Sequence, residues 1–471
     1  MELALKRRIF WIAGAALLGA LGIGAYFVNQ IVLVGAAYHA KMLCSGIFVA
    51  GRDATTVERE DIAANQHPVL RIIRARIDRQ QRTVSAGVFG LPQRRAVFRD
   101  GLGCTLAIGI SADELRNDPV TMVMPPARAS AQLWPAGDAV ELQRLPRAIN
   151  AAALQAAVAT AFTEPDPKHA RRTRALIVVY DGRIVAEHYA PGFSTETAQI
   201  GWSMSKSVTG ALIGVLTGDG KLALAQPAPV PEWRQAGDVR AAITLDHLLH
   251  MTSGLAFNED YGNATSDVVQ MLFATPDMAA YAAAKPLAAT PGTLWHYSTG
   301  TSVILARIVT RLAGDTLAAQ RSFPRRALFD RLGMRSAVFE LDPAGTFAGA
   351  SFLYASARDW ARFGLLYQRD GIWNGERLLP QGWVRYSLTP TPEATDFGAH
   401  LWRKVPRPYY RQNGARPTLP TDTFHIVGHH AQFISVIPSR KLVVVRLGLS
   451  GAWSWDQEQL LEQLLDAVPL R

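Results

Sequence analysis

The most strongly apolar stretch of the chain lies close to its N-terminus. A basic cluster, Lys6 to Arg8, precedes an apolar run from Ile9 to Val28. About 20 residues rising about 1.5 Å each are enough to cross a hydrocarbon core of roughly 30 Å. The apolar pattern resumes from Ile31 to Tyr38, so the helix is expected to continue or to tilt into the interface, with Tyr26 and Tyr38 as anchors. Residues 1–40 are therefore predicted to form a membrane anchor with Ile9–Val28 as its span.

The charge beside this run predicts on which side of the membrane the remaining chain lies. Because basic flanks stay in the cytoplasm, the N-terminus is expected inside, and everything after Ala40 is expected in the periplasm or outside the cell. A cleaved signal peptide is an alternative, since Val34–Ala36 resembles a small-residue cleavage site. Arg7–Phe10 is a weak match to a twin-arginine signal. A single-pass, uncleaved anchor in the inner (cytoplasmic) membrane is the favoured interpretation.

Short strands and turns are predicted between the anchor and about residue 150. Strand patterns at 84–89 and 96–99 flank the turn residues Gly90 to Pro92. An alanine-rich helix is expected over 148–162, and Pro165 and Pro167 end it. We interpret 41–150 as an accessory lobe and place the start of the main domain at residue 151.

The main domain, 151–471, has strand patterns at both ends and helical patterns between them. The dipeptide Asp181-Gly182 joins apolar segments at 175–180 and 183–189, and it supplies the positive φ angles of a type I′ hairpin turn. Strands are expected at 433–437 and 441–447, followed by a helix over 455–468. This order favours an α+β fold, in which an antiparallel sheet closed by both ends of the domain is flanked by helices and joined to a helical lobe.

Composition and charge narrow the classes of function. The 471 residues are 49% hydrophobic and 19% charged, which is typical of a globular protein. Their net charge is +10, but the basic residues are mostly not clustered with aromatic ones, so no nucleic-acid partner is predicted. The densest basic group has helical spacing and is interpreted as a solvated helix face, with anionic lipid as its other contact. It comprises Arg71, Arg74, Arg76, Arg79 and Arg82.

The chain contains two cysteines, Cys44 and Cys104. Neither has the spacing of a CxxC or zinc-ligand motif, so no metal site is predicted, and we expect no cofactor. In an oxidising compartment the two form a candidate disulfide, and closing a loop of about 60 residues stabilises a fold by roughly 4 kcal/mol on the chain-entropy model. Two separate buried thiols are the alternative.

An S-x-x-K sequence places a candidate nucleophile beside a candidate base. Ser203 and Lys206 stand where a loop enters a helical run, and side chains three residues apart share one face of a helix. A lysine desolvated in a pocket can lose its proton near neutral pH and activate a serine hydroxyl. The motif is common by chance, and its alternative interpretation is purely structural: a helix cap followed by an exposed lysine.

The segments around this motif resemble the serine β-lactamase and penicillin-binding protein superfamily, in its class C, esterase-like and 6-aminohexanoate-dimer hydrolase-like branch. The resemblance runs from about residue 175 to the C-terminus, with the family's order and spacing. Six segments carry it: the Asp181-Gly182 hairpin, Gly201–Ser207, Ile243–Leu255, Trp295–Gly300, Tyr354–Gly364, and Gly428–Gln432 before Pro438. The resemblance implies a β-lactamase/transpeptidase-like fold for the main domain.

The resemblance also implies roles for residues at matching positions. Ser203 is expected to be the acylated nucleophile, Lys206 its proton acceptor, and Tyr297 the relay to the leaving group. A phenol can act as a base when a nearby cation stabilises its anion. Backbone N–H groups of Ser203 and His429 are expected to form the oxyanion hole. Tyr261 lies on a segment expected to overhang the site and is a weaker candidate for substrate contact.

Two motifs depart from those of the penicillin-recognising branches. Thr299 stands where those branches place an asparagine, and Ile426-Val427-Gly428 stands where they place Lys-Thr-Gly or His-x-Gly. The cation that receives a β-lactam carboxylate is therefore missing, unless His425, His429 or His430 replaces it in part. The same departures occur in the branch that hydrolyses amides and esters.

These observations favour a membrane-anchored serine hydrolase that cleaves an ester or non-lactam amide of a small molecule through an acyl-enzyme on Ser203. A β-lactamase or D-Ala-D-Ala carboxypeptidase is the alternative among enzymes. A non-catalytic binding or sensor protein with the same fold is the alternative outside them. The presence of all three catalytic side chains favours the enzyme.

Overall fold

A five-stranded antiparallel sheet forms the centre of the protein. The computed structural model describes residues 2–63, 68–120, 122, 125, 131–410 and 416–468. The strands follow the order β12-β13-β14-β5-β6, so both ends of the main domain close the sheet, as predicted. Their bounds are Thr173–Tyr180 for β5, Arg183–Tyr189 for β6, Phe424–Gly428 for β12, Gln432–Ile437 for β13 and Leu442–Gly448 for β14. Asp181 and Gly182 have φ angles of 46° and 77°, which confirms the predicted type I′ turn.

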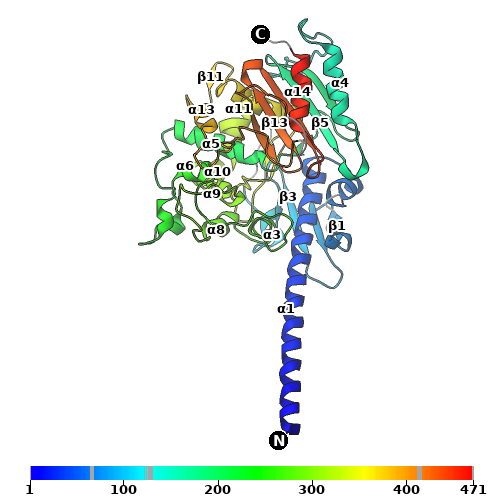
Figure 1. Cartoon of the computed structure of the whole chain (residues 1–471), viewed down its shortest axis with the longest axis vertical. Coiled ribbons are helices and arrows are strands. Elements are labelled where there is room, and N and C mark those ends of the chain that lie inside the picture. Colours follow the sequence, from blue (N-terminus) through cyan, green and yellow to red (C-terminus); the bar gives the residue numbers. More distant parts are fainter. Residues whose placement is uncertain are drawn as a thin grey trace.

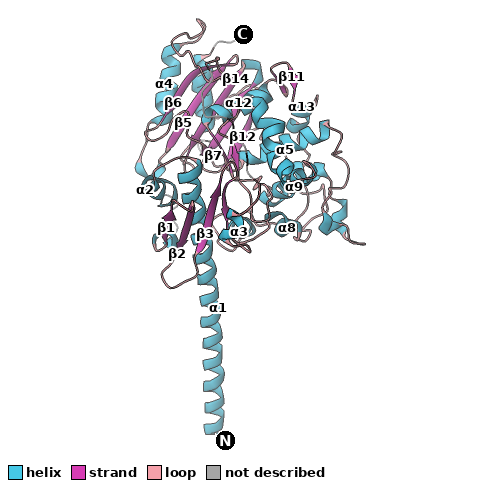
Figure 2. Cartoon of the chain, turned by 180° about the vertical axis from the view of Figure 1, so that it is seen from behind, coloured by secondary structure: helices cyan, strands magenta, loops and turns pink. Residues whose placement is uncertain are grey.

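Helices cover both faces of this sheet because alternate side chains of each strand point to opposite sides. Leu176 and Val178 of β5 pack on one side with α4 (Ala151–Phe162) and α14 (Gln457–Ala467). Ile177 and Val179 pack on the other side with α12 (Ala357–Gln368). Figures 1 and 2 show these two layers from opposite directions. The strands are apolar on both faces, as expected for a sheet buried between layers.

A helical lobe lies beside the sheet and carries most of the segments between β6 and β12. Its helices are α5 (Met204–Gly218), α6 (Leu245–Leu249), α7 (Asp267–Phe273), α8 (Met278–Ala283), α9 (Thr299–Leu312), α10 (Leu317–Pro324), α11 (Asp330–Leu332) and α13 (Trp383–Leu388). Short strands form two small sheets, one of β7 (Gln199–Ile200), β9 (Leu353–Ala355) and β8 (Val338–Phe339), the other of β10 (Ile372–Trp373) and β11 (Glu376–Arg377).

The N-terminal region combines one long helix with a second antiparallel sheet. The helix α1 runs over Glu2–Cys44, and its first half projects away from the body in Figure 1. Its second half packs against the four-stranded sheet β1-β2-β3-β4. The remaining bounds are Arg74–Asp78 for β1, Thr83–Gly87 for β2, Arg94–Arg99 for β3, Gly103–Leu106 for β4, Ala54–Val57 for α2 and Ala112–Arg116 for α3.

The two halves of α1 have different surroundings. Among the described residues, Tyr26–Val49 is the segment long and apolar enough to cross a membrane, yet 78% of its apolar window is buried inside the protein. A core helix and a signal sequence share these properties. Tyr38, which was expected at a membrane interface, instead packs edge-on against Phe273 of α7, with ring centroids 5.5 Å apart. The apolar surface left uncovered lies earlier, where Phe10, Trp11 and Leu18 are each at least 70% exposed.

The predicted arginine-rich helix is wrong. Residues 74–78 form strand β1, paired antiparallel with β2. Arg74, Arg76 and Asp78 are exposed, whereas Ala75 and Ile77 between them are half-buried. Charged residues at every second position, as here, are typical of a strand with one solvated face. The longer arginine series also fits a helix, but pairing with β2 stabilises the strand.

Two contacts fasten the end of α1 to the rest of the protein. Cys44, its last residue, forms a disulfide with Cys104 on β4, which confirms the predicted pair. One turn earlier, buried Lys41 forms an ion pair with buried Glu340 of the main domain. The Glu340 carboxylate also accepts hydrogen bonds from Ser45 Oγ at 2.8 Å and the Cys104 N–H at 2.7 Å. Buried charges are tolerated when they are paired and hydrogen-bonded in this way, so α1 is locked to the main domain at this point.

Candidate active site

Ser203 stands at the start of α5, directly after a residue with strained backbone. β7 ends at Ile200, Trp202 has a φ of 47°, and α5 begins at Met204. Positive φ angles are uncommon for residues other than glycine and are found disproportionately at functional sites. Ser203 is the N-cap residue of α5, but its side chain makes no capping hydrogen bond. Its hydroxyl is therefore free to interact with the side chain of Lys206.

Lys206 follows Ser203 by three residues and reaches its hydroxyl. The Lys206 Nζ lies 2.9 Å from Ser203 Oγ and also donates to Thr299 Oγ1 and the Ala350 carbonyl, each at 3.1 Å. The lysine is only 2% exposed. Burial lowers the pKa of Lys206 to about 8, against the opposing charge of Glu259. About one molecule in ten with this pKa carries a neutral amine at pH 7, so Lys206 can accept the serine proton.

Tyr297 is the third predicted catalytic side chain, and the structure places it beside the other two. The Lys206 Nζ lies 5.0 Å from the centroid of the Tyr297 ring. Burial raises the pKa of Tyr297, and an interaction with the Ser203 hydroxyl offsets part of this rise. The ring stacks on Trp402 with centroids 5.8 Å apart and meets Phe397 edge-on at 6.1 Å. These two aromatic rings hold the phenol next to the serine and the lysine.

The end of β12 lies directly against the nucleophile segment. A Cβ added to Gly428 would lie 2.1 Å from the Gly201 carbonyl oxygen, so no larger residue fits there. This close approach brings His429, the next residue, to Trp202, whose ring it meets edge-on with centroids 5.8 Å apart. The predicted oxyanion-hole pair, Ser203 and His429, therefore lies on two segments in contact with each other.

Tyr261 also reaches this site, from the loop before α7. Its ring stacks on the His429 imidazole with centroids 5.3 Å apart and 14° between the planes. Its hydroxyl lies 3.4 Å from Thr299 Oγ1. The structure thus brings together all five residues that the sequence analysis singled out for catalysis, the oxyanion hole and substrate contact.

Glu259 is a site residue that the sequence analysis did not identify. Its carboxylate accepts hydrogen bonds from the Thr299 N–H at 2.8 Å and from the Thr299 hydroxyl. Burial raises the pKa of Glu259, while the Lys206 charge acts in the opposite direction. Thr299, which was noted as a departure from the penicillin-recognising branches, thereby links the carboxylate to the lysine. In the sequence, Glu259 stood out only as an acidic residue two positions before Tyr261. Its position in a loop could not show that it approaches Lys206.

The three histidines considered as replacements for the missing cation do not supply one. His425 lies within β12, its Nδ1 is 2.8 Å from Ser435 Oγ, and burial lowers its pKa to about 3. Burial lowers the pKa of His429 to about 4 and also lowers the pKa of His430. All three rings are therefore neutral at neutral pH, and none offers a charge to a substrate carboxylate.

Comparison with known proteins shows which family the main domain matches. Residues 151–466 match the β-lactamase family. The 6-aminohexanoate-dimer hydrolase of Paenarthrobacter ureafaciens is 29% identical over 232 residues, which are 46% of this chain and 57% of the relative. The chain thus spans little more than half the length of that curated relative.

Two solved structures share the fold at low identity. A β-lactamase-related protein of Bacteroides dorei has a TM-score of 0.52 and 16% identity over 68% of this chain and 99% of its own. A penicillin-binding protein homologue of Caulobacter crescentus has a TM-score of 0.50 and 18% identity over 67% of this chain and 96% of its own. Because the family match covers well over half of the sequence, the protein belongs to the β-lactamase family.

Proposed function

We propose that the protein is a membrane-anchored serine hydrolase that cleaves an ester or a non-lactam amide through an acyl-enzyme on Ser203. The observation that supports this most directly is the 2.9 Å hydrogen bond between Lys206 Nζ and Ser203 Oγ. The lysine that makes it is buried and has a pKa of about 8, as a general base requires.

Acylation follows from the positions of the three side chains. Neutral Lys206 accepts the Ser203 hydroxyl proton as Oγ bonds to the substrate carbonyl carbon. The carbonyl oxygen becomes an oxyanion, which the N–H groups of Ser203 and His429 stabilise. When the bond to the leaving group breaks, Tyr297 gives it a proton and recovers one from the Lys206 ammonium. The products are acyl-Ser203 and a neutral alcohol or amine.

Deacylation uses the same groups in reverse. As its oxygen attacks the acyl carbon, water gives a proton to Tyr297, which passes its own proton to Lys206. The N–H groups of Ser203 and His429 stabilise the second oxyanion. Cleavage of the ester bond then returns a proton to Ser203 Oγ and releases the carboxylic acid. No external reductant, oxidant or co-substrate besides water enters this cycle.

The anchor is proposed from the uncovered part of α1. Residues 9–28 are almost all apolar, and Phe10, Trp11 and Leu18 contact no protein layer that buries them. The loop between β2 and β3 points along this part of α1 in Figures 1 and 2, and its Phe89 is fully exposed. An apolar helix and an apolar loop tip that project from the same side of the protein are typical of a surface that contacts a membrane. Of the predicted anchor at 1–40, residues from about 31 to 40 pack inside the protein body, so we propose that the anchor is the uncovered part with Ile9–Val28 as its span. It is followed in this proposal by an accessory lobe at 41–150 and an exported hydrolase domain at 151–471.

The proposed substrates are esters and linear amides rather than β-lactams. The relative named 6-aminohexanoate-dimer hydrolase acts on a linear amide by its name. Because the rings of His425, His429 and His430 are neutral, none of the three supplies a cation to a β-lactam carboxylate, and a missing charged hydrogen bond lowers reactivity by about 10- to 100-fold.

Labelling and turnover by the full-length chain test the proposal. A fluorophosphonate is expected to label the protein in the membrane fraction, with the label resisting extraction by alkaline carbonate. Turnover is expected on p-nitrophenyl esters or small amides, and nitrocefin should react about 10- to 100-fold more slowly for lack of a cation. A labelled band that carbonate releases would contradict the anchor. A protein that shows no labelling and no turnover would contradict the enzyme and would favour a binding or sensor protein.

The pH dependence of kcat/KM is expected to follow Lys206. Activity should rise with pH and level off above about 8, because the lysine must lose its proton to act and its pKa is about 8. Glu259 raises the pKa of Lys206, so the Glu259→Gln variant should show the same limb displaced to lower pH. Steady-state kinetics from pH 6 to 10 measure both profiles. Displacement of the Glu259→Gln limb to higher pH would contradict this assignment.

A further inference from the structure

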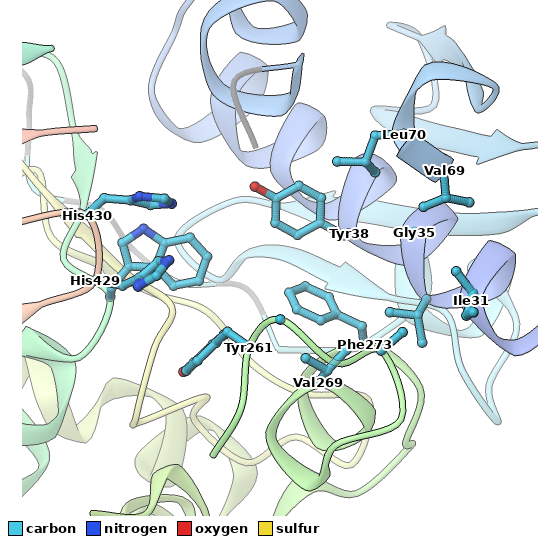
Figure 3. A pocket seen from close by; sticks show the side chains of 14 residues that line it. Ile31, Gly35, Tyr38, Val69, Leu70, Tyr261, Val269, Phe273, His429 and His430 are labelled. Atoms are coloured by element: carbon cyan, nitrogen blue, oxygen red, sulfur yellow. The ribbon is translucent and has the colours of Figure 1, made fainter. Parts of the chain in front are cut away.

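An apolar pocket joins the nucleophile segment to the part of α1 that leaves the protein body. Its volume is about 120 Å³. Trp202, Tyr261 and His429 line one end, and Ile31 and Gly35 of α1 line the other. Figure 3 shows the two ends on opposite sides of the opening. A ligand in this pocket would thus extend from Trp202, the residue before Ser203, toward the projecting helix.

The lining selects an uncharged, apolar occupant. Val34, Val69, Leu70, Val269 and Phe273 form its middle and outer walls, and no aspartate, glutamate, lysine or arginine is among the described lining residues. A charged group moved there would lose its hydration without gaining a partner. An apolar cavity of about 150 Å³ can hold a benzene molecule, so this one accommodates a short hydrocarbon segment.

The position of Tyr297 assigns this pocket to one side of the scissile bond. Tyr297 protonates the leaving group in the proposed mechanism, and its ring packs against Phe397 and Trp402. None of these three side chains lines the pocket. The leaving group therefore departs on the side of Tyr297, and the acyl group lies on the side of Trp202 and His429.

The outer end of the pocket lies next to the apolar segment of α1. Ile31 follows Val28, the last residue of the predicted span, by three positions, or about 4.5 Å along a helix axis. Tyr26 and Val28 are each 60% exposed, so the uncovered apolar surface continues to the mouth of the pocket. The half-buried polar pair Asn29 and Gln30 lies between Val28 and Ile31, and a hydrocarbon chain leaving the bilayer at this height meets apolar side chains on both sides of that pair.

We propose that the pocket holds the aliphatic acyl chain of a membrane amphiphile, so that the substrates are medium- to long-chain acyl esters or amides that enter from the bilayer. This inference rests on the proposed function, because it needs the acyl-enzyme on Ser203. The acyl carbon is transferred to Ser203 Oγ with its chain in the pocket, the alcohol or amine headgroup leaves with the Tyr297 proton, and water releases the fatty acid.

The acyl-chain profile of the full-length protein in detergent micelles tests this inference. p-Nitrophenyl acetate, butanoate, octanoate and dodecanoate are the probes. Each buried CH₂ is expected to raise kcat/KM by about fourfold, so octanoate should exceed acetate by at least about 100-fold. Placing the same octyl chain on the alcohol side, as octyl acetate, should give no comparable gain over ethyl acetate.

Variants that fill the pocket are compared by their octanoate-to-acetate ratio of kcat/KM, because a general structural defect lowers both rates and leaves the ratio unchanged. Ala264→Phe and Val69→Phe narrow the pocket from two different elements, and each is expected to reduce the octanoate-to-acetate ratio to about one tenth of its wild-type value or less. Val239→Phe, at a site 68% exposed and outside the pocket, is the matched control and should keep the wild-type ratio. Fluorophosphonate labelling verifies that each variant is folded.

The outcomes separate this inference from the proposed function. A flat chain-length profile with normal, Ser203-dependent acetate turnover would overturn the acyl-chain pocket and leave the serine hydrolase intact. A preference for the chain on the alcohol side, or an unchanged ratio in both filling variants, would also overturn it. Loss of all labelling and turnover in the wild-type protein would overturn both.

Discussion

Replacement of Ser203 by alanine is expected to abolish covalent labelling and to reduce kcat by about six powers of ten, the loss typical of a removed serine nucleophile. The hydroxyl is the atom that Lys206 Nζ contacts at 2.9 Å, and no acyl-enzyme can form without it. Activity that survives would come from the oxyanion hole and substrate positioning alone. Fluorophosphonate labelling together with turnover of p-nitrophenyl esters measures both losses on the same preparation.

Two neighbouring serines serve as matched controls for this change. Ser205 Oγ donates to the Trp202 carbonyl at 2.7 Å, and Ser207 Oγ donates to the His400 carbonyl at 2.6 Å. Both are buried, so Ser205→Ala and Ser207→Ala should lower the free energy of unfolding by about 1 to 3 kcal/mol but retain labelling. A Ser203→Ala protein with near wild-type turnover would contradict the proposed mechanism.

The parts of the fold that the sequence predicted well are those set by local rules. The Asp181-Gly182 turn requires two positive φ angles, which few other dipeptides adopt, and the structure has both. The strands near 433 and 441 and the last helix were found because their apolar residues repeat with the period of each element. The S-x-x-K spacing likewise predicts the contact between Ser203 and Lys206 from helix geometry alone.

The parts that the sequence did not predict depend on distant partners. The second half of α1 is apolar enough for a membrane, and only its packing against β2 and β3 shows that it belongs to the core. Strand β1 was taken for a helix because its partner, β2, is not visible in the local charge pattern. Glu259 meets Lys206 through Thr299 because two loops converge, a contact that sequence spacing does not reveal.

The residues that meet at the candidate site were therefore predictable from the sequence, whereas their environment was not. The resemblance to a family supplied the positions of Tyr297 and His429. The neutrality of the three histidines, by contrast, follows from burial, which lowers the pKa of His425 to about 3 and of His429 to about 4. The pocket that runs to Ile31 arises where α1, the loop before α7 and the end of β12 meet, so it needed the folded chain.

Lys206→Ala and Tyr297→Phe are each expected to reduce kcat by several powers of ten. The double variant is expected to lose less than the product of the two single losses. In the proposed mechanism the lysine removes the Ser203 proton and the tyrosine carries it to the leaving group, so losing either would interrupt one continuous proton path. The 5.0 Å separation of Lys206 Nζ from the Tyr297 ring centroid is consistent with such a unit. Pre-steady-state and steady-state turnover of the two single variants and the double variant, with thermal unfolding as the folding control, measures the coupling. A double variant whose loss equals the product of the two single losses would contradict a shared path, because independent groups contribute additively to the activation free energy.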